Sequence, residues 1–151
     1  VLAGLNPPEG VHTLVTIGSP LGLPPIQVRN LSLREPPGFV GNKPPAPEGI
    51  SDCWINMSDI RDKIALDHTL ENDYRENSRG IKARDLYVYN DYVIGGRENP
   101  HKAYGYLRTP EMAEVIARFA AGGRSGFYRQ FRRVIDRISR GLEIFMKSHS
   151  R

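Results

Sequence analysis

The run from His12 to Gly18, HTLVTIG, is apolar and β-branched along almost its whole length. A strand of this composition is typical of a parallel sheet, in which both faces are covered. Two later runs, CWINMSD (53–59) and RDLYVYN (84–90), have a related character, and each ends in polar residues. Because long connections separate the three runs, we expect an α/β fold built on a parallel sheet with flanking helices.

The first connection is rich in proline. Ten of the twelve prolines lie before residue 48, most of them in LPPIQVRNLSLREPPGFVGNKPPAPEG (23–49). Each proline removes a hydrogen-bond donor and clashes with the preceding helical turn. The composition therefore predicts no regular helix here, but a loop or lid over residues 20–50 with a short strand-like piece at 26–28. The second connection, between residues 60 and 80, is polar and irregular.

Helical patterns follow the last strand. TPEMAEVIARFAAGG (109–123) begins with Thr109 as N-cap and Pro110 at the first helical position, and it ends in glycines. The tail 124–151 predicts an amphipathic helix with arginines opposite an apolar stripe. The stripe consists of Phe127, Phe131, Val134, Ile135, Ile138, Leu142 and Phe145. We therefore divide the chain into a domain at 1–123 and a basic tail at 124–151.

The charge distribution, the apolar runs and the cysteine content limit the classes of protein to which this chain can belong. Eight Lys/Arg against two acidic residues give segment 124–151 a net charge of +6, and the other 123 residues carry −2. No apolar run approaches the roughly 18 residues that span a bilayer, and no signal peptide is evident. The single cysteine, Cys53, lies in an apolar run and reads as a buried structural thiol. These features are compatible with a cytoplasmic protein.

Polar residues gather where the predicted strands end. Gly18, Ser19 and Pro20 follow the first strand; the later strand ends offer Asn56, Asp59, Asp62, Asn90, Asp91 and finally His101. Open α/β sheets bind ligands at this carboxyl edge. An Asp after one strand and a His after the next is the acid-then-base order of an α/β-hydrolase.

Three blocks of the sequence, TLVTIGSPLGLP, WINMSDIRDKIA and NPHKAYGYL, resemble consecutive blocks of the α/β-hydrolase superfamily in its lipase and serine-esterase branch. The resemblance covers roughly residues 1–121. It implies that Asp62 is the catalytic acid and His101 the catalytic base, with Asp59 as the nearest rival for the acid and Asp85 a distant one. It further implies a serine hydrolase acting on an ester, thioester or amide. No His/Asp/Glu spacing in the sequence resembles a metal cage, so we expect no metal and no cofactor.

The nucleophile of that family is missing from these residues. No G-x-S-x-G elbow occurs in the chain, and Ser19 in IGSPLG matches a structural turn. The opening VLAGLNPPEG resembles the end of the helix that follows the elbow. We therefore expect a carboxyl-terminal half of a hydrolase, with the nucleophilic Ser outside this chain and another segment or chain completing the sheet.

An alternative remains open at this point. The chain could be an inactive or split hydrolase-like scaffold whose basic tail binds nucleic acid or a protein partner. The tail could also pack on the body, mediate oligomerisation or lie on a membrane; nucleic acid is the weaker expectation for it, and a membrane the weakest. For the hydrolase, the expected substrate is a small or lipid-like acyl compound. His68 reads as a surface residue that could also help line the mouth of the site. His12 opens a strand and His149 lies in the tail, and neither suggests chemistry.

Overall fold

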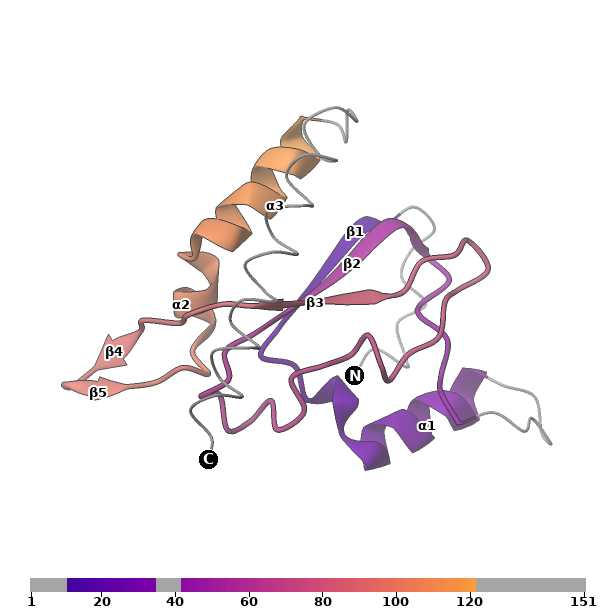
Figure 1. Cartoon of the computed structure of the whole chain (residues 1–151), viewed down its shortest axis with the longest axis horizontal. Coiled ribbons are helices and arrows are strands. Elements are labelled where there is room, and N and C mark those ends of the chain that lie inside the picture. Colours follow the sequence, from indigo (N-terminus) through magenta and orange to yellow (C-terminus); the bar gives the residue numbers. More distant parts are fainter. Residues whose placement is uncertain (1–10, 35–41, 122–151) are drawn as a thin grey trace, which may run out of the picture.

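A three-stranded parallel sheet forms the centre of the computed structural model, which describes residues 11–34 and 42–121 (Figure 1). Its strands are β1 (Val11–Ile17), β2 (Ile50–Ser58) and β3 (Ala83–Tyr87), in the order β1-β2-β3. Both pairings are parallel. The three predicted strands are thus confirmed, with ends shifted by a few residues, and so is the parallel sheet.

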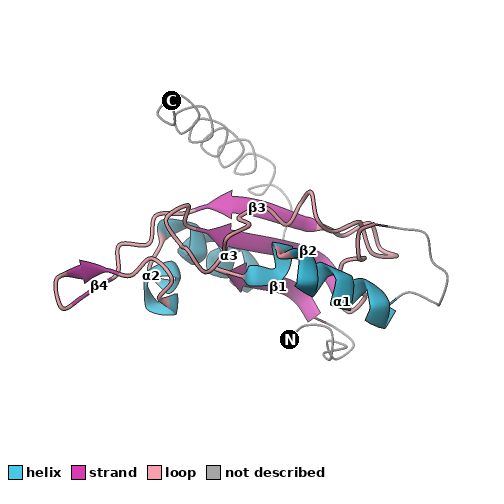
Figure 2. Ribbon diagram, turned by 90° about the horizontal axis from the view of Figure 1, so that it is seen from below, coloured by secondary structure: helices cyan, strands magenta, loops and turns pink. Residues whose placement is uncertain are grey.

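Helices cover both faces of this sheet. Helix α1 (Pro24–Arg34) lies on one side, and α2 (Ala103–Leu107) and α3 (Pro110–Ala120) lie on the other, as the two views show (Figures 1 and 2). A short 3-10 turn, η2 (Pro20–Gly22), joins β1 to α1. None of the helices in the described ranges is long and apolar enough to cross a membrane.

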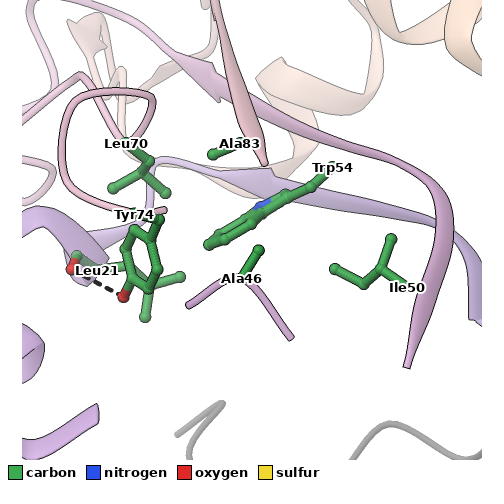
Figure 3. Packing of buried hydrophobic residues seen from close by; sticks show 7 residues of the cluster. All are labelled: Leu21, Ala46, Ile50, Trp54, Leu70, Tyr74 and Ala83. Atoms are coloured by element: carbon green, nitrogen blue, oxygen red, sulfur yellow. Dashed lines mark hydrogen bonds between the residues drawn. The ribbon is translucent and has the colours of Figure 1, made fainter. Parts of the chain in front are cut away.

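Successive side chains along a strand point to opposite faces of the sheet, and this produces two separate cores. On β2, Trp54 belongs to the core beneath α1, whereas Met57 belongs to the core beneath α2 and α3. The first core contains Leu21, Ala46, Ile50, Trp54, Leu70, Tyr74 and Ala83 (Figure 3). The second contains Met57, Leu86, Val88, Tyr106, Met112 and Val115. β1 and β2 carry apolar residues on both faces, so their sequences read as nearly continuous apolar runs, whereas Arg84 and Asp85 interrupt the run of β3.

The prediction that the proline-rich connection forms no regular helix is wrong, and so is the predicted strand-like piece at 26–28. Residues Pro24–Arg34 are an α-helix that begins with two consecutive prolines. Proline at the start of a helix costs no hydrogen bond, since the first N–H groups have no partner within the helix. Side chains anchor α1 to the body: Gln27 donates to the carbonyl of Gly22 at 2.6 Å, and Asn30 to the Tyr74 hydroxyl at 2.8 Å.

Two elements follow β3 before α2. Strands β4 (Val93–Ile94) and β5 (Arg97–Glu98) form an antiparallel hairpin that projects from the body (Figure 1). Its turn is Gly95-Gly96, with φ of 56° and 74°, which suits glycine. At α3, the Thr109 side chain accepts from the Met112 N–H, which confirms the predicted N-cap. The predicted tail helix at 124–151 lies outside the described residues.

Candidate active site

Two residues predicted to carry chemistry come together at the carboxyl edge of the sheet. Asp62 lies in the turn after β2, where its N–H donates to the carbonyl of Asp59 at 2.8 Å. His101 lies just before α2. The Nδ1 atom of His101 is 3.1 Å from Oδ1 and 3.0 Å from Oδ2 of Asp62. Thirty-nine residues separate the two in sequence, so the fold alone brings them into contact.

The two partners differ sharply in exposure. The Asp62 side chain is completely buried, whereas 48% of the His101 side chain is exposed. The ring therefore has one nitrogen held by a buried carboxylate and a second nitrogen free of that contact. An imidazole held this way can accept a proton at Nε2 while the carboxylate stabilises the resulting cation.

Additional donors surround the Asp62 carboxylate. Oδ1 accepts from the N–H of Ile64 at 2.9 Å and from that of Ala65 at 3.4 Å. Oδ2 accepts from the hydroxyl of Tyr106 at 2.8 Å. All three groups are donors, so the Asp62 oxygens accept in each of these contacts. An ionised carboxylate has no proton to give, so Nδ1 of His101 carries the hydrogen in their shared contact.

Gly18, at the end of β1, makes this arrangement possible. It adopts φ of +49°, and its N–H donates to the carbonyl of Met57 at 2.9 Å. A Cβ at this position would overlap Oδ2 of Asp62 and would lie 3.1 Å from the Tyr106 hydroxyl oxygen. Only glycine allows the backbone to pass so close to the carboxylate. Sequence reasoning placed Gly18 in a turn but did not connect it with Asp62.

Asp59, the nearest rival for the acid, has a different role. Arg61 binds both of its oxygens, through Nε at 3.0 Å and Nη2 at 2.7 Å, and the N–H of Asn90 donates at 2.7 Å. Burial alone would raise the pKa of Asp59, but these donors outweigh it and hold the pKa below its ordinary value. Arg61 also reaches Glu98 of β5 at 2.7 Å. Asp59 therefore joins the ends of β2, β3 and the hairpin.

Asp85, the distant rival, belongs to a polar row across the sheet. Thr16, Asn56 and Asp85 are register partners on the three strands, and both links between their side chains are 2.9 Å. The N–H groups of Leu70 and Glu71 also donate to Asp85. Burial raises the pKa of Asp85 in spite of these donors. This carboxylate fixes the connection between β2 and β3.

Asn90 holds the backbone on both sides of His101. Its Nδ2 group donates to the carbonyl of Pro100 at 2.7 Å and to that of Lys102 at 2.9 Å. Asn90 is fully buried, and a Cβ on Gly105 would overlap its side chain. Sequence reasoning noted Asn90 as a polar strand end but missed this contact, because nothing local in the sequence links an amide to carbonyls 10 and 12 residues away.

The remaining serine and cysteine side chains make contacts that serve the fold. The Ser19 hydroxyl accepts from the N–H of Leu21 at 3.3 Å and caps η2, which confirms its predicted turn role. Ser58 and Nδ1 of His68 lie 2.7 Å apart, but only 2% of Ser58 is exposed, so its hydroxyl is closed to substrate. Cys53 is a buried free thiol, as predicted, and burial raises its pKa.

Comparison with models of known protein families, with curated proteins and with solved structures finds no match to this chain. The functional assignment therefore depends on the site itself.

Proposed function

We propose that this chain supplies the acid and the base of a serine hydrolase of the α/β-hydrolase type, which cleaves an ester, thioester or amide by acyl transfer. Asp62 is the acid and His101 the base. The nucleophilic serine is contributed by a segment outside this chain. The substrate is a small or lipid-like acyl compound.

One observation carries the proposal: a completely buried carboxylate holds Nδ1 of a histidine whose side chain is half exposed. A histidine that only stabilised the fold would need no half-exposed side chain. A general base, by contrast, needs a fixed tautomer on one side and access to the nucleophile on the other. The position after the sheet's carboxyl edge agrees with ligand binding in open α/β folds.

The proposed roles follow acyl-transfer chemistry. Nε2 of His101 takes the proton of the serine hydroxyl as its oxygen attacks the substrate carbonyl, and Asp62 stabilises the imidazolium. His101 then returns that proton to the leaving group, and water repeats the sequence to release the acid. The donors that stabilise the oxyanion would come from the segment that carries the serine.

Labelling of the full-length protein with a fluorophosphonate probe tests this proposal. The probe reacts with an activated serine, so we expect labelling in the native protein and its loss in His101→Ala. In Asp62→Asn the rate should fall by about three to four orders of magnitude, since the histidine loses its orienting partner. Absence of labelling between about pH 6 and 9 would overturn the assignment.

His68→Ala is the matched control, because His68 is a second histidine that pairs with a serine at the same end of β2. We expect this variant to label at the native rate. Labelling that survives in His101→Ala but disappears in His68→Ala would instead move the active site to the Ser58–His68 pair.

A further inference from the structure

Tyr106 lies in α2, five residues after His101, and none of its surface is exposed. Its hydroxyl makes two hydrogen bonds: it accepts from the backbone N–H of Asp59 at 3.1 Å and donates to Oδ2 of Asp62 at 2.8 Å. Sequence reasoning gave this residue no role.

The direction of these bonds is fixed by the count of protons. A backbone N–H can only donate, so the hydroxyl oxygen of Tyr106 must accept from Asp59. The single hydroxyl proton is then free to point only at Asp62. Burial, assisted by the neighbouring carboxylates, raises the pKa of Tyr106 well above its ordinary value, so this donor keeps its proton at any physiological pH.

We infer that Tyr106 is a positioning residue for the Asp62–His101 pair: its hydroxyl fixes the orientation of the carboxylate and withdraws part of the negative charge that His101 faces. The backbone at Gly18 closes the same side of the carboxylate. The inference rests on the proposed function for its kinetic consequences, but its electrostatic consequence can be measured without catalysis.

Removal of this donor has a definite sign. In Tyr106→Phe the Asp62 carboxylate keeps more of its charge, so the His101 ring should hold its proton to a higher pH, by roughly half a pH unit or more. Charged groups close to the pair include Asp59, which forms an ion pair with Arg61; Lys63 and Lys102 are adjacent to the pair in sequence. Neither lysine is altered by the substitution.

The test is a ¹⁵N NMR titration of the His101 ring in the full-length protein, together with the pH profile of fluorophosphonate labelling. In Tyr106→Phe we expect both midpoints to move to higher pH and kcat for a model ester to fall roughly tenfold, with KM changed by less than about twofold. Tyr104→Phe is the matched control: Tyr104 lies on the same helix, but 63% of it is exposed, and it should leave both midpoints in place.

A second variant guards against loss of folding. Replacing Tyr106 with 3-fluorotyrosine keeps both hydrogen bonds but makes the hydroxyl a stronger donor, so the His101 midpoint should move to lower pH. Movement in opposite directions for the two replacements would support the inference. Unchanged midpoints in a folded variant would overturn it. A shifted NMR midpoint in a protein that never labels would retain Tyr106 as a positioning residue and reject the proposed function.

Discussion

The candidate site can assemble only because Gly18 has no Cβ. At Gly18 two requirements coincide, the positive φ of +49° and the contact with Asp62, and each alone favours glycine. Gly80 adopts a similar conformation, with φ of +73°, but the nearest atom to a Cβ there is 4.0 Å away. The two glycines therefore separate the cost of the backbone conformation from the cost of crowding.

We expect Gly18→Ala to lower the free energy of unfolding by about 2–4 kcal/mol, which combines the backbone term with overpacking. Gly80→Ala should cost only about 1 kcal/mol, because it carries the backbone term alone. Urea unfolding of both variants checks the difference. Equal losses of stability would show that Asp62 and Tyr106 move away from the new methyl group at no cost.

At the scale of elements, Asp59 and Arg61 connect three of them. Their ion pair follows β2 and contacts the backbone of Asn90 after β3. Arg61 also reaches Glu98 in the hairpin and lies over the ring of Tyr89, 4.0 Å from its centroid. Only 2% of the Asp59 side chain is exposed, so the hydrogen bonds act in an environment that water screens weakly.

Asp59→Asn should destabilise the fold in a pH-dependent way. The folded-state pKa of Asp59 is lowered, so its contribution is present above the unfolded-state pKa of about 3.9 and is lost as the pH falls through the folded-state value. We expect a loss of about 1–3 kcal/mol at pH 7 that shrinks towards zero in acid. Urea unfolding from pH 7 to pH 3 measures it. Asp91→Asn, which affects a largely exposed pair with Arg108, should change little at either pH.

The elements differ in how far the sequence predicts them. β1 was predictable because a strand that packs on both faces of a sheet is largely apolar, as HTLVTIG shows, whereas β3, with Arg84 and Asp85, gives a weaker pattern. Helix α1 was not, because proline breaks a helix in its interior but is favoured in the first turn, where Pro24 and Pro25 lie. The Gly95-Gly96 turn between Val93-Ile94 and Arg97-Glu98 is a recognisable hairpin signal that sequence reasoning overlooked.

The candidate site, like the fold, was predictable from the sequence only in part. Asp62 and His101 were placed by the order of strand ends and by a family resemblance, and the structure brings them into contact. Their catalytic roles remain a prediction. The roles of Tyr106 and of Asn90, although Asn90 was among the strand-end residues, could not be predicted in this way, since they depend on how α2 and the end of β3 pack together. Such contacts between side chain and distant backbone leave no periodic pattern in a sequence.

For the molecule as a whole, the unpaired edge of β1 bears on what this chain associates with. β1 is an outer strand of the sheet, and within the described residues nothing pairs with the side of it that faces away from β2. Its residues are mostly half-buried rather than buried, although the run is as apolar as a central strand. We propose that another segment or a second chain pairs with this edge, which would also bring the nucleophile beside His101.

We therefore expect this chain alone to self-associate. Sedimentation velocity of residues 1–151 should show oligomers or aggregates that disappear when the partner segment is present. Hydrogen exchange should then show new protection at those amides of β1 that point away from β2. A monomeric, well-folded chain whose β1 amides exchange no faster than those in the complete protein would contradict the proposal.

The amide of Asn90 has one more consequence, for the evolution of the loop that leads to His101. It ties the chain at Pro100 and Lys102, while the N–H of Asn99 donates to the carbonyl of Tyr92 at 2.9 Å, so the hairpin is closed at its base. The exposed tip of the hairpin, beyond that closure, can gain or lose residues without moving the imidazole of His101. The tip is thus where related chains could vary without moving His101, and where a tag could be inserted.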